Sequence, residues 1–148
     1  MLQASGSTYI DAGALLGAQA GRAVLALRRL VGDIEGASQL ELPADKHLYA
    51  GGSATVRGYK FQSVGPLFPD NTPQGGTAVV AGTLEPRQRI RGDYGAVAFV
   101  DAGQVAADGW SFPGTWGVGA GVGARYYAAI GPIWLDVAVP IRYRRSPA

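Results

Sequence analysis

The sequence predicts an all-β protein, an antiparallel up-and-down transmembrane β-barrel, on three observations. Long segments alternate between apolar residues and small or charged ones, which is the period of a strand and not of a helix. Glycine and proline are frequent, at 23 and 9 residues, and only 16% of residues are charged, against roughly 25% in soluble domains. Hydrophobic residues make up 47% of the chain. Because no run approaches the roughly 18 apolar residues of a spanning helix, these residues must lie in strands or in a soluble core.

Six segments are predicted to be strands, and each exceeds the usual strand length of about five to six residues. A strand that crosses a membrane at a tilt needs about 9–11 residues, which fits these segments. Short polar or glycine-bearing turns join most of them, as an up-and-down sheet requires. The predicted strands are residues 8–18, 22–33, 76–87, 94–104, 116–128 and 133–144.

The third and fourth predicted strands each carry one carboxylate, Glu85 and Asp101. A carboxylate that faced lipid would cost a few kcal/mol near the middle of the bilayer. Both carboxylates are therefore predicted to face inward. The residues predicted to share the inward face are Thr77, Val79, Ala81, Thr83, Glu85 and Arg87 in one strand and Gly95, Val97, Phe99, Asp101 and Gly103 in the next.

The alternation is clearest in the last two strands. In the fifth, one face carries Trp116, Val118, Ala120, Val122, Ala124 and Tyr126, and the other carries Gly117, Gly119, Gly121, Gly123, Arg125 and Tyr127. In the sixth, Ile133, Leu135, Val137, Val139, Ile141 and Tyr143 oppose Trp134, Asp136, Ala138, Pro140, Arg142 and Arg144. One apolar and one polar face indicate that each strand separates two different environments.

Lipid and a soluble core are both compatible with such apolar faces. A soluble β-sandwich would bury the aliphatic face and show the same pattern. Aromatic residues at strand ends on the apolar face, namely Trp116, Tyr126 and Tyr143, favour the membrane because aromatic girdles lie at its interfaces. The inward glycines 117, 119, 121 and 123 allow two interpretations, a sharp bend of the sheet or room for a packed segment.

A long loop, residues 34–74, separates the second and third predicted strands. Loops of this length are usually functional or disordered. This one holds apolar residues that need burial, including Leu48, Val56, Tyr59 and Phe61. A loop that folds back into a barrel lumen would bury them.

Several motifs, taken in order, resemble the outer-membrane barrel superfamily of BamA and TamA (the bacterial surface antigen superfamily), and TamA-like assembly factors most closely. They are Gly51-Gly52-Ser53-Ala54-Thr55-Val56-Arg57-Gly58-Tyr59, Gly75-Gly76, Glu85-Pro86-Arg87, Phe99-Val100-Asp101-Ala102-Gly103 and Gly131-Pro132-Ile133-Trp134-Leu135-Asp136. The resemblance covers nearly the whole chain. It implies an integral protein of the bacterial outer membrane that contacts outer-membrane lipid. It also implies assembly or translocation of client outer-membrane or autotransporter proteins, with a periplasm-spanning protein as a possible partner.

The resemblance further implies that Arg57 of the loop enters the lumen and pairs with Glu85 and Asp101. The chemistry of these residues agrees. Two inward carboxylates on adjacent strands repel each other unless a cation lies between them, and the planar guanidinium suits that position better than lysine. Gly58 would let the backbone turn tightly, and Tyr59 would add a stacking or hydrogen-bonding contact. Arg125, Asp136 and the glycine row, together with Arg22, Arg28 and Arg142, are expected to line the lumen.

Other functions have less support in the sequence. No basic run is interleaved with aromatics, which argues against nucleic-acid binding. No cysteine is present and His47 stands alone, so neither a metal site nor another cofactor is expected. A paired-carboxylate hydrolase would need one raised carboxyl pKa, whereas an arginine between the two carboxylates keeps both ionised. We therefore expect no enzymatic activity.

Residues 1–148 are expected to be part of a larger barrel domain. The resemblance implies sixteen strands and an aromatic final strand, so this chain would be a C-terminal, six-strand fragment that lacks the last strand. Six strands are too few to close a membrane barrel, for which about eight is the minimum. Three further interpretations stay open: a two-partner secretion pore, the barrel anchor of a fused patatin-like lipase, and a soluble β-sandwich binding module.

Overall fold

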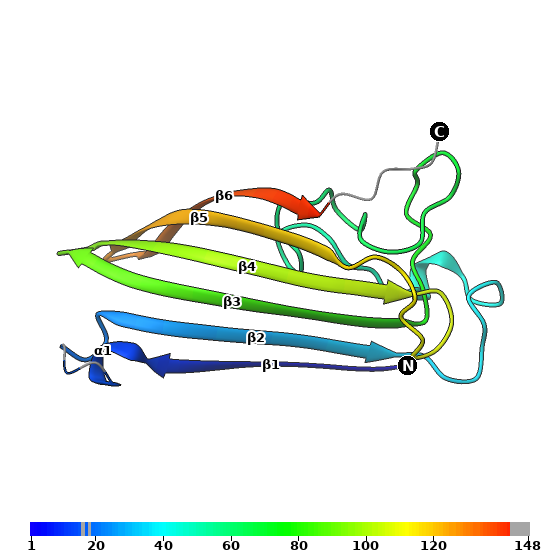
Figure 1. Ribbon diagram of the computed structural model, residues 1–148, viewed down its shortest axis with the longest axis horizontal. Helices are drawn as coiled ribbons and strands as arrows, with labels where there is room; N and C mark the ends of the chain where they lie inside the picture. Colours follow the sequence, from blue (N-terminus) through cyan, green and yellow to red (C-terminus); the bar gives the residue numbers. More distant parts are fainter. Residues whose placement is uncertain (16, 18, 143–148) are drawn as a thin grey trace.

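The computed structural model describes residues 1–15, 17 and 19–142, and these form one antiparallel sheet of six strands in the order of the sequence (Figure 1). The strands are β1 (Leu2–Asp11), β2 (Ala23–Asp33), β3 (Ala78–Arg91), β4 (Tyr94–Ala106), β5 (Gly117–Ala128) and β6 (Gly131–Arg142). A short helix, α1 (Ala12–Leu15), and a 3-10 turn, η1 (Ala44–Lys46), lie outside the sheet. The predicted all-β, antiparallel up-and-down fold is confirmed. No helix in the described part of the chain is long and apolar enough to cross a membrane.

The first strand is the element that the sequence analysis placed wrongly. It covers Leu2–Asp11, paired from Leu2 opposite Asp33 to Asp11 opposite Val24, and not residues 8–18. The reason is the carboxylate of Asp11, which accepts hydrogen bonds from the backbone N–H of Ala14 (3.0 Å) and of Gly21 (2.7 Å). These bonds turn the chain immediately after Asp11, although the apolar residues that follow resemble a strand in sequence.

The other five strands were predicted to within a few residues. The largest difference is in β3, which continues through Arg91 and was expected to end at Arg87. The sixth strand begins at Gly131, and the part of its prediction that falls on Tyr143 and Arg144 lies outside the described residues.

The two ends of the sheet differ in their connections. At one end, tight turns join β3 to β4 and β5 to β6. At the other end lie the segment 34–77 between β2 and β3 and the segment 107–116 between β4 and β5 (Figure 1). Residues 12–22, which include α1, join β1 to β2 at the first end (Figure 1). Outer-membrane barrels have their longest loops on the extracellular side, and the longest connection of this sheet, segment 34–77, lies at the second end.

The sheet has one covered and one exposed face. The covered face, hereafter the inner face, carries the odd-numbered residues of β3, β4 and β5, and most of these are buried in the covered part of each strand. The opposite, outer face carries exposed apolar side chains such as Leu84 (45%), Val100 (44%) and Val122 (62%). The observed alternation is the one that the sequence predicted for these three strands.

The hydrophobic core lies between the inner face and the segment 34–77. Its buried members are Ile34, Leu48, Ala50, Val56, Val64, Val79 and Val105, of which the first five belong to that segment. Burying one aliphatic side chain contributes about 1.5–3 kcal/mol. The segment is therefore a folded part of the domain, and its side chains form the core that the inner face of the sheet lacks.

Candidate functional site: a buried arginine cluster on the inner face

The site begins with a tight loop in the backbone at Gly51–Tyr59. Gly51, Gly52 and Gly58 have φ values of 109°, 97° and 92°, which side-chain-bearing residues rarely adopt. The N–H of Gly52 donates to the carbonyl of Val56 (3.1 Å), and the N–H of Gly51 donates to the Thr55 hydroxyl (2.8 Å). Val56 is fully buried. These bonds fix the loop so that the next side chain, Arg57, points along the inner face.

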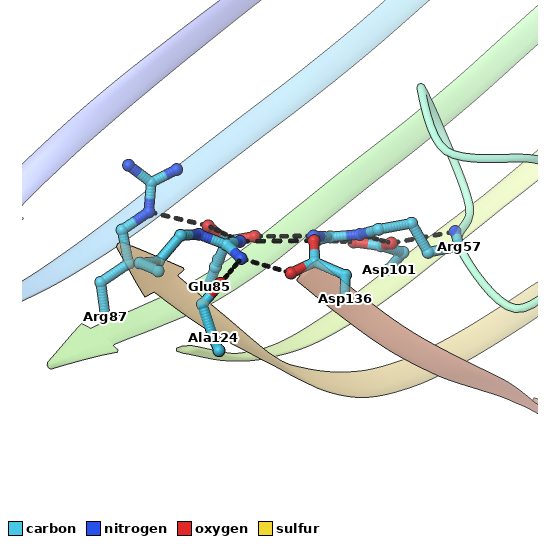
Figure 2. A network of polar contacts seen from close by, with 7 residues as sticks. Arg57, Glu85, Arg87, Asp101, Ala124 and Asp136 are labelled. Carbon is cyan, nitrogen blue, oxygen red and sulfur yellow. Dashed lines mark hydrogen bonds and ion pairs between the residues drawn. The ribbon is translucent and has the colours of Figure 1, made fainter. Parts of the chain in front are cut away.

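Arg57 makes its closest contacts with Asp101 of β4. Its Nε donates to Asp101 Oδ2 (2.7 Å) and its Nη2 donates to Oδ1 (2.9 Å), a two-bond fork between planar groups (Figure 2). The backbone N–H of Arg57 also donates to Asp101 Oδ2 (3.0 Å). The guanidinium carbon lies 3.4 Å above the centre of the Phe99 ring. Asp101 is fully buried, so Arg57 must neutralise the charge of this carboxylate in place of water.

Two further strands reach the same guanidinium. Nη1 of Arg57 donates to Glu85 Oε2 of β3 (2.8 Å) and to Asp136 Oδ2 of β6 (3.2 Å). Carboxylates from three different strands thus converge on one loop side chain. Burial alone would lower the pKa of the Arg57 guanidinium, but its hydrogen bonds to Asp101 and Glu85 outweigh burial and raise that pKa above its ordinary value. Arg57 is therefore permanently charged.

The cluster continues along the sheet to two more arginines. Arg87 Nε donates to Glu85 Oε1 (2.7 Å), and Arg125 forms an ion pair with Asp136 and donates to the carbonyl of Ala124 (3.0 Å). The members, hereafter the inner-face cluster, are Arg57, Arg87, Arg125, Glu85, Asp101 and Asp136. Three positive and three negative side chains balance. In such a cluster each buried charge has a partner of opposite sign, and the cluster holds the loop and the strands together.

The glycine row of β5 provides the space for these contacts. A Cβ atom at Gly119 would overlap the carbonyl oxygen of Arg57, and one at Gly117 would lie 2.7 Å from Cγ1 of Val64. Further along, a Cβ at Gly121 would lie 2.5 Å from Cζ of Phe99, and one at Gly123 would overlap the Asp136 carboxylate. The loop therefore fills the space above the first two glycines, and the phenyl ring and the carboxylate fill the space above the other two.

Two neighbours of Arg57 attach the loop to the sheet. The Tyr59 hydroxyl accepts a hydrogen bond from the backbone N–H of Val118 in β5 (3.2 Å). Gly58 lies against β6, where a Cβ atom would come 2.7 Å from the carbonyl carbon of Val139. Together with the ion pairs, these contacts connect the loop to β3, β4, β5 and β6.

A comparison with known protein families identifies the chain. The model of the Omp85 superfamily domain matches residues 2–147. The chain belongs to the Omp85 superfamily. Members of this superfamily are β-barrel proteins of the outer membrane that assemble or transport proteins. The inner-face cluster and the loop that it holds are therefore features of an Omp85 domain.

The structure extends the set of residues that the sequence analysis placed around Arg57. Glu85 and Asp101 lie within hydrogen-bonding distance of it, as the inward alternation of β3 and β4 predicts. Asp136 was expected only to line the wall, yet it also contacts Arg57. The cross-strand pairing shows why Asp136 and Phe99 reach Arg57. Asp136 is opposite Gly123 and Phe99 is opposite Gly121, so each larger side chain has a glycine beside it.

The remaining residues that the sequence analysis named have different positions. Arg22 is exposed in the segment before β2 and donates to the carbonyl of Ile90 (2.9 Å). Arg28 is on the inner face of β2, opposite Thr83, and is exposed. His47 is a half-buried residue of the segment 34–77, and its two ring nitrogens lie 2.7 Å from the carbonyl oxygen of Gln74 and 3.0 Å from that of Gln39. The Arg142 side chain lies outside the described residues.

Proposed function

We propose that this Omp85 chain is part of a TamA-like factor that inserts or exports client β-proteins at the outer membrane, and that the inner-face cluster holds its long loop against the barrel wall. The observation that carries the proposal is the burial of Arg57 among three carboxylates from three strands. A barrel that handles client strands must keep its wall intact while neighbouring strands separate. A loop bonded to several strands at once would provide this rigidity.

The proposal treats residues 1–148 as part of a larger barrel. In the described sheet β1 and β6 are edges, each with one unpaired side. Backbone groups in lipid need hydrogen-bond partners, so further strands would have to pair with both edges. The six strands would then form a section of wall, and the client would be handled elsewhere in the barrel. The partners of the complete protein would be outer-membrane lipid, client β-proteins and a periplasm-spanning protein.

The decisive test is Arg57→Ala in the full-length protein in its own outer membrane. We expect a local destabilisation of about 3 kcal/mol, because the buried carboxylates of Glu85 and Asp101 lose their shared cation. The loop should then become sensitive to protease added outside the cell, and the assembly of client barrels, measured by heat-modifiable gel mobility, should fall. Lys46→Ala is the matched control, since the Lys46 side chain is 65% exposed and, among the described residues, forms an ion pair only with Asp45.

The outcomes separate the possibilities. Normal client assembly by an inserted Arg57→Ala protein would refute the role of the cluster. Loss of a single exported protein, with all other barrels assembled normally, would instead indicate a two-partner secretion pore.

A further inference from the structure

One arginine is on the face of the sheet opposite to the inner-face cluster. Arg29 of β2 pairs with Gly6 of β1 and with Gly82 of β3. Its chain neighbour Arg28 pairs with Thr83, which in turn pairs with the buried Asp101 of the inner face. Because successive residues of a strand point to opposite faces, Arg29 is on the outer face. That face is otherwise apolar around it, with Leu27 and Leu84 exposed beside each other.

Arg29 has no partner for its charge within the described part of the chain. Its side chain is exposed and makes no hydrogen bond or ion pair with any described residue. In an Omp85 protein the outer face of the sheet meets lipid. A charged side chain there is unfavourable, and increasingly so toward the middle of the bilayer. An anion at the same depth would remove that cost.

The surroundings of Arg29 leave room for such an anion. Both directly opposed residues are glycines. A Cβ atom at Gly6 would meet nothing within 4 Å, and one at Gly82 would meet only the carbonyl of Arg28, at 3.7 Å. The guanidinium can therefore lie flat against the sheet between two notches in which a bulky headgroup would fit. Leucine or valine at these positions would close the notches.

The position of Arg29 along β2 indicates which leaflet of the membrane its side chain would reach. Asp33, at the end of β2 that leads into the long segment 34–77, is four residues beyond Arg29. In a tilted strand four residues span about 10 Å along the membrane normal, at about 3.3 Å per residue. Long arginine side chains extend toward the nearer interface. Since the long loops of outer-membrane barrels are extracellular, the nearer interface is that of the outer leaflet.

We infer that Arg29, between Gly6 and Gly82, forms a binding site for the phosphate group of an outer-leaflet glycolipid. A phosphate monoester has an anionic charge with no cation of its own, and arginine binds it through two parallel hydrogen bonds. This site lies on the far side of the sheet from the loop. It rests only on the outer-membrane placement of the family, and the proposed role in client assembly can fail without affecting it.

The test measures lipid retention by the full-length protein in phosphatidylethanolamine vesicles that contain bisphosphorylated lipid A. After extraction and purification, the lipid A that co-purifies is quantified by mass spectrometry. We expect Arg29→Gln to reduce retention roughly tenfold, because glutamine can still donate one hydrogen bond to the phosphate but loses the charge and the second bond. Arg28→Gln is the matched control, because it removes the same charge one residue away on the inner face, and it should retain lipid A like the wild type.

Two more arms keep the result decisive. Wild-type protein should retain little dephosphorylated lipid A. If Arg29→Gln fails to insert, as judged by heat-modifiable mobility, Gly82→Leu keeps the charge, fills one notch and should also reduce retention. Equal retention by wild type and by the variant that inserts would overturn the inference. So would equal retention of phosphorylated and dephosphorylated lipid, or an equal loss in Arg28→Gln.

Discussion

The inner face of this sheet consists of two regions with opposite character. Over β3, β4 and β5 it is covered by the long segment, and residues such as Val79, Phe99 and Asp101 are nearly or fully buried. Over β1 every residue from Leu2 to Ile10 is exposed, and the inner face carries polar side chains such as Ser5 and Ser7. The covered region has glycines and carboxylates that fit the loop around Arg57, whereas the inner face of β1 stays exposed.

This difference shows which parts of the domain require particular residues at particular positions. A strand that only borders water or lipid needs the right alternation and little else. A strand that receives a loop must also leave space at defined positions and supply charges at others. Substitutions in the covered region should therefore be costly, and those in the open region nearly neutral.

The largest effect is expected for Asp101→Asn. The substitution preserves shape but removes a fully buried charge that accepts three hydrogen bonds from Arg57. Breaking a buried ion pair by changing one partner costs about 3–5 kcal/mol, and Glu85 and Asp136 still compensate Arg57 in part. We therefore expect a loss of about 3 kcal/mol in the free energy of unfolding, measured by urea titration of the protein in vesicles.

The control for that measurement is Asp45→Asn, which changes an exposed carboxylate of the segment 34–77 whose side chain is 69% accessible. It should change stability by less than about 0.5 kcal/mol. Equal unfolding midpoints for the two variants would mean that the cluster contributes nothing to stability.

An intermediate effect is expected for Gly119→Ala. The added methyl group would overlap the carbonyl oxygen of Arg57, which is backbone and has no rotamer to change. The loop must shift away from β5, and overpacking of this kind costs about 1–3 kcal/mol. Hydrogen exchange of the loop amides should accelerate. Gly6→Ala is the matched control, because its added methyl group meets nothing within 4 Å, and the loop amides should then exchange as in the wild type.

The sequence was sufficient for five of the six strands and for the central ion pair. Period-two alternation marks both faces of β3, β4 and β5, and the inward carboxylates of β3 and β4 demand a cation. The start of the chain was less predictable, because the turn after Asp11 depends on side-chain bonds to Ala14 and Gly21 that no periodicity encodes.

Contacts between distant segments were the other part that the sequence did not reveal. Which glycine faces which loop atom depends on the three-dimensional path of residues 34–77. Gln104 illustrates this limit. Alternation places Gln104 on the outer face, and in the observed register it is opposite Val80. Its amide is nevertheless buried beside Gly114, without a hydrogen-bond partner among the described residues. Only the fold of the segment 107–116 brings these two residues together.

The smallest effect is expected for Ser7→Ala on the open region. Ser7 is opposite Arg28 on the inner face of β1, and its hydroxyl makes no hydrogen bond within the described part of the chain. Its removal should change the unfolding free energy by less than about 0.5 kcal/mol, the usual range for surface positions. The same urea titration in vesicles measures it. A loss as large as that of Gly119→Ala would mean that another part of the protein packs against β1 and β2. Both regions of the inner face would then be covered, each by a different segment.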